Sequence, residues 1–237
     1  DGRYQLAVIN HMPRETVEMF ELINVDNSWT LIWRGCVNAP KTGYFNDVAL
    51  RSDGSFFTTQ MYEKDISYLN LAYISYTKPD TGFVYQWDTN DGFKKVPNSE
   101  GSFPNGISIS DDEKNLFINY VFNHRTSKLN LKNLTVEAEH FSEGTPDNSS
   151  IDGDFIWVAT QDNTGTDLLI HCDETVIQCS LPFTIYKLRQ DDLSEVKTFS
   201  FKHTQMGSVT VGVPHKDKLW LGTFMGDRIA SFNLNQE

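Results

Sequence analysis

The feature that most constrains the fold is a hydrophobic hairpin that occurs four times along the chain. The hairpins span residues 46–59, 105–120, 147–159 and 207–223, and in each a tight turn joins two runs of alternating apolar residues. Such alternation is typical of antiparallel β-strands. A repeat length of about 40–60 residues fits four-stranded blades with some insertions. The pattern therefore predicts an all-β protein built as a β-propeller, with helical character only in residues 66–73.

Each hairpin begins with small polar residues, and three of the four begin with oxygen donors. These donors are Asn46 and Asp47, Asn105, and Asp147 with Asn148. If each hairpin forms the inner strands of a blade, these residues meet at one end of a central channel. Carboxylate and amide oxygens are the ligands that calcium takes in proteins. Asn and Asp also occur in turns because they bond their own backbone, but their recurrence at equivalent positions favours a metal site.

Composition limits the classes of function. The chain has 237 residues, is 39% hydrophobic and carries a formal net charge of −12. This length and hydrophobic content indicate a single domain over residues 1–237. Nucleic acids and anionic membrane surfaces need a basic face, so the acidic excess argues against both as partners. The sequence contains no apolar run long enough to span a bilayer, and we expect no transmembrane segment.

The first residues enter directly as a predicted strand, over residues 4–10. A propeller that starts inside a blade leaves strand edges and half of a core exposed, which proteins avoid. We therefore expect the first blade or so to lie before residue 1, so that the 1–237 domain is incomplete on its N-terminal side. Three explanations stay open: the missing piece is disordered, is absent from this polypeptide, or is an N-terminal fragment of the same precursor retained after cleavage.

The cysteines give a limited indication of compartment. Cys172 and Cys179 flank a polar loop that a small disulfide can close in an oxidising compartment, and two free thiols fit the sequence nearly as well. Cys36 is the odd cysteine. Asn133 begins a glycosylation sequon in a predicted surface loop. Together these features favour a secreted or extracellular protein.

Several short motifs follow one another along the chain. They are Asn10-His11, residues 16–20, Asn46-Asp47-Val48, residues 105–110, Asp147-Asn148, residues 156–158 and residues 207–223. Their order resembles that of the paraoxonase/arylesterase family, whose wider relatives are gluconolactonase and strictosidine-synthase-like propellers. The resemblance covers essentially the whole chain. It implies a six-bladed β-propeller that holds two calcium ions in its channel.

The resemblance also implies a role for each oxygen donor. Asn46, Asn105, Asp147 and Asn148 would bind a catalytic calcium ion, and Asp47 a second, structural one; in the family, acidic residues of the first blade complete both sites. The four proposed catalytic ligands carry one formal negative charge, which leaves coordination positions open. Such an ion is suited to polarise an ester or lactone carbonyl and to stabilise the oxyanion that develops.

By resemblance, His11 matches the histidine proposed as the general base, because imidazole titrates near neutral pH. Two supporting histidines are expected, one within residues 33–37 and one at residues 160–161, but neither segment contains a histidine. The sequence leaves two roles open for His11: a catalytic base, or a hydrogen-bonded structural histidine at the end of a strand.

Four residues near predicted channel-facing loops are candidates for the wall of a substrate pocket. They are Phe45, Tyr62, Gln161 and Phe224. For the aromatic residues among them, packing between blades is the more common role.

Two functions from different classes follow from these observations. The first is a calcium-dependent hydrolase of small-molecule lactones or aryl esters, in which calcium polarises the carbonyl and a water activated by His11 attacks it. The second is a propeller that binds a small molecule, or catalyses a non-hydrolytic natural-product reaction, in the same calcium-containing cup. The oxygen donors favour the first, and the missing histidines motivate the second.

Overall fold

The computed structural model describes residues 4–164, 167, 170–172, 177 and 179–235. Strands dominate this part of the chain, together with helix α1 (Tyr68–Thr77), which overlaps the stretch expected to be helical. Ser67 caps the start of α1, since its side chain accepts a hydrogen bond from the Asn70 amide. Lys78, in the left-handed conformation, ends the helix.

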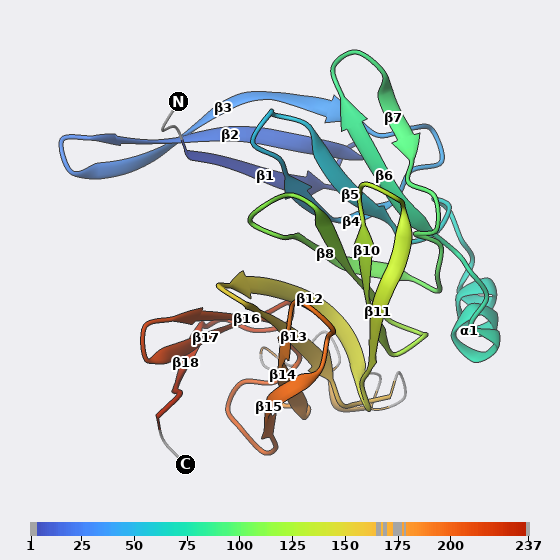
Figure 1. Cartoon of the computed structure of the whole chain (residues 1–237). Coiled ribbons are helices and arrows are strands. Elements are labelled where there is room, and N and C mark those ends of the chain that lie inside the picture. Colours follow the sequence, from blue (N-terminus) through green and yellow to red (C-terminus); the bar gives the residue numbers. More distant parts are fainter. Residues whose placement is uncertain (1–3, 165–166, 168–169, 173–176, 178, 236–237) are drawn as a thin grey trace. The chain divides into compact units, whose positions relative to one another are not determined.

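The described strands form five sheets, labelled in Figure 1. In chain order they are β1 (Tyr4–Asn10), β2 (Thr16–Val25) and β3 (Ser28–Asn38); β4 (Phe45–Leu50), β5 (Phe56–Gln60), β6 (Phe83–Asp88) and β7 (Gly92–Lys95); β8 (Pro104–Ile109), β9 (Asn115–Tyr120), β10 (Arg125–Asn130) and β11 (Thr135–Phe141); β12 (Thr145–Asp152), β13 (Phe155–Gln161), β14 (Phe183–Arg189) and β15 (Glu195–Phe201); and β16 (Val209–His215), β17 (Lys218–Thr223) and β18 (Ala230–Asn233). Each sheet is a meander, because strands that follow one another in sequence are neighbours in the sheet.

The chain divides by its internal contacts into two compact units. Unit 1 is Asp1–Pro104 and unit 2 is Asn105–Glu237. The boundary falls at the first residues of β8, so unit 1 holds the first two sheets and unit 2 the last three.

The sheets of unit 2 pack face to face. β9 contacts β12, and both β12 and β13 contact β16. Between the first two of these sheets lies an apolar cluster of Phe117, Ile156, Val158, Tyr186, Leu188 and Leu193. Between the last two lies a second cluster that includes Trp157, Phe183, Ile185, Val209 and Leu219. β13 therefore supplies alternate residues to both cores, as a strand inside a propeller does.

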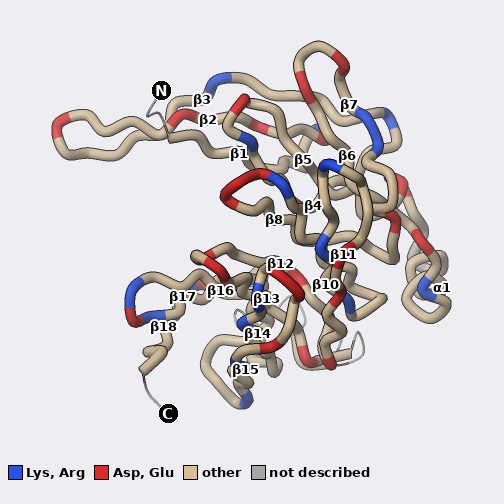
Figure 2. Tube along the Cα trace, in the orientation of Figure 1, with Lys and Arg blue, Asp and Glu red and all other residues tan. Residues whose placement is uncertain are grey.

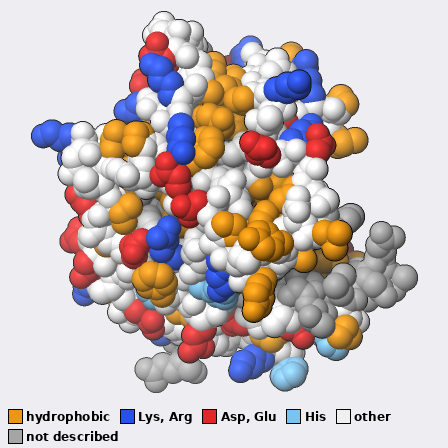
Figure 3. Space-filling model, turned by 90° about the vertical axis from the view of Figure 1, so that its right-hand side faces the viewer, with side chains coloured by type: hydrophobic (Ala, Val, Ile, Leu, Met, Phe, Trp, Pro, Cys, Tyr) orange, Lys and Arg blue, Asp and Glu red, His pale blue; other side chains and the backbone are white. Residues whose placement is uncertain are grey.

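The two sheets of unit 1 share a core between β1–β3 and β4–β7. Val17, Phe45 and Phe56 are fully buried at its centre. The first sheet turns its other apolar face to the surface, where β1 and β3 expose large side chains: Tyr4, Leu6, Val8, Trp29, Leu31 and Trp33. Apolar side chains also lie among charged ones on the face seen in Figure 3.

Acidic and basic residues are interspersed along the sheets, as the tube in Figure 2 shows. None of the helices in the described part of the chain is long and apolar enough to cross a membrane. Cys172 and Cys179 form a disulfide, which settles the alternative that the sequence left open, and Cys36 is a free thiol. Residues 173–176 and 178 of the intervening loop lie outside the described residues.

The all-β class and the propeller architecture are confirmed, because within each unit successive meander sheets pack face to face as blades. The number of blades differs from the prediction: the described residues form five sheets rather than six blades. A sixth blade, expected before residue 1, stays a prediction.

Candidate metal and hydrolase site

Two of the predicted ligand pairs lie on β-bulges. On the ladder of β4 and β5, Phe45 pairs with Gln60 and Val48 with Thr58, so Asn46 and Asp47 oppose one residue. Pro146 and Ser149 of β12 pair with Thr160 and Val158 of β13, so Asp147 and Asn148 also oppose a single residue. A bulge leaves one residue out of the ladder and re-aims its side chain. Both hairpins therefore present their oxygen donors at a β-bulge.

In unit 2, β8 and β12 approach each other at the predicted ligands. A Cβ atom on Gly106 would lie 2.6 Å from Asn148 Cα and closer still to the carbonyl oxygen of Asp147. Asn119, fully buried on β9, donates from Nδ2 to the same carbonyl oxygen at 2.7 Å. The close backbone approach places Asn105, the neighbour of Gly106, beside Asp147 and Asn148.

The Asp147 carboxylate accepts a hydrogen bond at each oxygen. Asn148 Nδ2 donates to Oδ1 at 3.0 Å, and Gln161 Nε2 donates to Oδ2 at 2.7 Å. Because the Asn148 amide nitrogen faces Asp147, its carbonyl oxygen is directed elsewhere. Gln161 comes from the end of β13, so two strands of one sheet orient this carboxylate.

In unit 1 the Asp47 carboxylate is held by the adjacent backbone, since its Oδ1 accepts the Val48 amide at 2.8 Å. The backbone of Asp47 is tied to β5, since its amide donates to Thr59 Oγ1 at 3.1 Å and its carbonyl accepts from Thr58 Oγ1 at 2.8 Å. Asn46 Nδ2 lies 3.4 Å from the sulfur of Met61. Its Oδ1 has no hydrogen-bond partner among the described residues, so this oxygen is available to a ligand.

The donor set fits calcium by its chemistry, because every predicted ligand offers carboxylate or amide oxygen. Across the residues that the structure describes, no group of three or more His, Cys, Asp and Glu side chains gathers as a metal site would. An amide-rich set contains too few such residues to form one. Unit 2 contains Asn105, Asp147 and Asn148, and unit 1 contains Asn46 and Asp47. That all five residues meet at one axis stays a prediction.

His11 lies in the bend that joins β1 to β2. Its Nδ1 is 3.0 Å from each carboxylate oxygen of Glu15, and its side chain is 43% exposed. The ring stacks on Tyr44, with 4.8 Å between the centroids and 21° between the planes. His11 is thus oriented on two sides while one edge stays open to solvent.

Glu15 is the residue that sequence reasoning missed. Its side chain is 5% exposed, and Oε1 also accepts the backbone amide of Phe45 at 2.8 Å. The sequence analysis sought imidazole support in residues 33–37 and 160–161, whereas the partner is a carboxylate four residues along the same bend. The available signal was an acidic residue four positions after a histidine at a strand end, which is a weak one.

An aromatic series continues from Tyr44. Tyr62 stacks on Tyr44 at 5.1 Å and 26°, and Phe103 follows Tyr62 at 5.2 Å. Burial raises the pKa of Tyr62 to about 12, with further contributions from Tyr44 and from the charge of Glu15. Tyr62 is therefore a neutral phenol over the working range of a hydrolase.

A profile of the family described as Arylesterase matches residues 1–229. The chain belongs to the arylesterase family. The paraoxonase-like resemblance read from the motifs is thereby confirmed. A search of curated proteins found no match.

Solved structures similar to this arylesterase-family chain agree on the fold. A luciferin-regenerating enzyme superposes with a TM-score of 0.51 at 18% identity, over 91% of this chain and 68% of that one. Hydrazine synthase of Kuenenia stuttgartiensis gives 0.54 at 11% identity, over 87% of this chain and 51% of that one. A protein of unknown function from Bacteroides caccae gives 0.53 at 10% identity, over 99% and 91%. At such identities the likeness shows the fold alone.

The predicted pocket residues of this arylesterase-family chain take different places. Phe45 is fully buried in the core of unit 1, which is the packing role left open for it. Tyr62 belongs to the aromatic series, and Phe224 is 57% exposed. Gln161 lines a cavity of about 870 Å³ in unit 2, together with Asp162, Thr184 and Tyr186. Because Gln161 also bonds Asp147, this cavity lies next to the proposed ligands.

Proposed function

We propose that this arylesterase-family chain is a calcium-dependent hydrolase of lactones or aryl esters. The observation that carries the proposal is the matching β-bulge at Asn46-Asp47 and at Asp147-Asn148. Two hairpins that are distant in sequence present the same kind of oxygen donor by the same irregularity.

Asn46, Asn105, Asp147 and Asn148 would hold a catalytic calcium ion, and Asp47 a structural one. A bound calcium ion would supply Lewis-acid polarisation of the ester or lactone carbonyl. The chain contributes the orientation: Gln161 fixes the Asp147 carboxylate, and Thr58 and Thr59 fix the backbone of Asp47.

In the proposed reaction His11 is the general base. Its open edge can receive a proton from a water molecule, whose oxygen then forms the new bond to the carbonyl carbon. The proton passes from His11 to the leaving alcohol or phenol oxygen when the ester bond breaks. Water and ester are thus converted to acid and alcohol, with the imidazole restored.

The family relationship and the exposed apolar face of β1 and β3 support a sixth blade that covers this face. An N-terminal portion of the same precursor, continuous or cleaved, would supply it. The Cys172–Cys179 disulfide supports a secreted or extracellular location. Intact-mass analysis of the protein from its native source would reveal a second fragment.

The test is hydrolysis of a panel of lactones and aryl esters with and without calcium. We expect chelation to abolish turnover and added calcium to restore it. Asp147→Asn should lower kcat/KM at least ~100-fold, since it removes the one charge of the catalytic set. Asp152→Asn is the matched control, because Asp152 lies exposed at the far end of the same strand.

The outcomes separate the two functions that the sequence suggests. Calcium-dependent turnover lost in Asp147→Asn and kept in Asp152→Asn supports the hydrolase. A protein that binds calcium and is stabilised by small molecules, yet hydrolyses none of the panel, contradicts it and favours the binding or non-hydrolytic alternative.

A further inference from the structure

We propose that Glu15 is a positioning residue that fixes the tautomer of His11, so that Nε2 is the basic nitrogen. The inference rests on the proposed hydrolase function for its kinetic meaning. The contacts that support it all lie within unit 1, between the β1–β2 bend and the first residue of β4.

The Glu15 carboxylate is held from several directions. Oε1 accepts the Phe45 amide at 2.8 Å, and the backbone carbonyl of Glu15 accepts the Ala39 amide at 3.0 Å. With 5% exposure, the side chain has little freedom to turn away from His11. The carboxylate is therefore a fixed acceptor, attached to the strand that carries Asn46.

A fixed acceptor selects one tautomer of a neutral imidazole. One ring nitrogen of that form donates and the other accepts, and the proton goes to the nitrogen with an acceptor beside it. Both oxygens of Glu15 lie 3.0 Å from Nδ1, so Nδ1 donates and Nε2 keeps its lone pair. Stacking on Tyr44 then fixes the plane in which this lone pair lies.

The same carboxylate stabilises the ring after proton transfer. As an O–H bond of water breaks and an N–H bond forms at Nε2, a positive imidazolium develops beside Glu15. A carboxylate that orients a histidine and stabilises its cation is the arrangement of serine hydrolase triads. Glu15 thus supplies the support that the sequence analysis sought from a second histidine.

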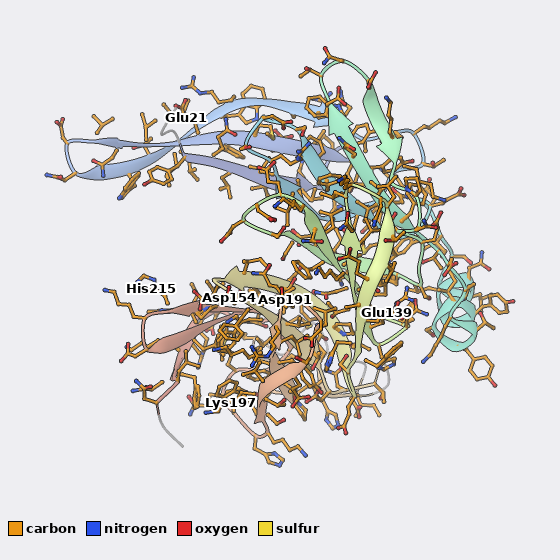
Figure 4. All side chains as sticks on the ribbon, in the orientation of Figure 1. Glu21, Glu139, Asp154, Asp191, Lys197 and His215 are labelled. Atoms are coloured by element: carbon orange, nitrogen blue, oxygen red, sulfur yellow. A yellow bond between two sulfur atoms is a disulfide. The ribbon has the colours of Figure 1, made fainter. Side chains whose placement is uncertain are left out.

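A purely structural role for Glu15 would rest on its bond to Phe45 alone. Glu15→Gln separates the two roles, because glutamine keeps the size and can still accept the Phe45 amide but loses the charge. Glu21→Gln is the matched control. Glu21 is a buried carboxylate on β2, labelled in Figure 4, that is bound to Arg34 about 17 Å along the ladder from the His11 end.

The decisive experiment reads the tautomer directly. In protein with 15N-labelled histidine, the ring signals of His11 are assigned by their loss in His11→Gln and recorded at alkaline pH. We expect the Nδ1–H form in the wild type and in Glu21→Gln, and a shift toward the Nε2–H form in Glu15→Gln. An Nε2–H ring in the wild type, or an unchanged ratio in Glu15→Gln, overturns the proposal. This readout needs no turnover, so it decides the role of Glu15 even where the proposed function fails.

Kinetics supply the second test. Glu15→Gln should lower kcat about 100-fold or more with little change in KM, and Glu15→Asp should recover part of the loss. In the His11→Gln background, Glu15→Gln should have no further effect, because it acts through His11. Additive losses, or an equal loss in Glu21→Gln, would show a structural role and contradict the proposal.

Discussion

At the scale of single residues, a glycine allows the backbones of two neighbouring sheets to lie close together. Gly106 on β8 lies against the backbone of Asp147 and Asn148, where even a methyl group would overlap Asn148 Cα. The approach brings the neighbour of Asn105 in the chain against the other two proposed ligands of unit 2. Glycine is required here because the backbones are close, not because its own backbone is in the left-handed region.

Gly106→Ala should therefore cost more than ~3 kcal/mol of unfolding free energy and displace Asp147 and Asn148. Gly153→Ala is the control, because Gly153 has φ of 54° and open space where a Cβ would lie. Its cost should be about 1–2 kcal/mol, from backbone strain alone. Urea unfolding of both variants measures the difference, and equal costs would show that the close approach does not matter.

Tyr62 gives a prediction about alkaline pH. Its pKa in the folded protein is about 12, against 10.0 for an unperturbed tyrosine. Between these values the unfolded chain loses the proton and the folded protein keeps it, so stability falls as pH rises from about 10 to about 12. Tyr62→Phe should flatten this decline in urea unfolding. Tyr76→Phe, at an exposed tyrosine of α1, should leave the decline unchanged.

The sequence predicted some of these residues and not others for physical reasons. The oxygen donors were found because they recur at one position of a repeated hairpin. Glu15 was not found, because its contact with His11 depends on the path of the backbone in the β1–β2 bend and not on a repeated sequence pattern. Phe45 was predicted to line a pocket because the sequence cannot distinguish an aromatic residue that faces a channel from one that faces the core.

At the scale of elements, alternation of apolar residues was sufficient to predict the hairpins. The first of them became β4 and β5, and the third β12 and β13. Their bulges were not predicted, because an extra residue changes the ladder without changing the residue types on either side. The disulfide was undecided for a similar reason: a separation of seven residues permits a bond but does not require one.

The disulfide can be checked by thiol labelling. Cys179 is fully buried, accepts a hydrogen bond from Ser208 Oγ at 3.0 Å, and is bonded to Cys172, so only Cys36 has a thiol to react. In denaturant without reductant one of the three cysteines should be labelled, and after reduction all three. Three labels before reduction would contradict the bond. Cys36→Ser should remove the single early label.

At the scale of the whole molecule, the sequence predicted the order of the strands but not the division of the chain into two compact units. Nearest-neighbour meanders follow from hairpins in sequence, and the arylesterase family match over residues 1–229 agrees with them. The division after Pro104 has no counterpart in the sequence, since it falls at the start of a strand rather than in a linker. The expectation of one domain over residues 1–237 stays a prediction.

The extra residue in β4 and in β12 carries a consequence for how such proteins diversify. The ladders on either side of each bulge would join without it, so deleting one codon there could leave a regular sheet that has lost its donors. The reverse insertion could create donors in a sheet that had none. Gain and loss of this chemistry in the lineage could then proceed through single-residue indels, without any change to the buried faces that hold the sheets together.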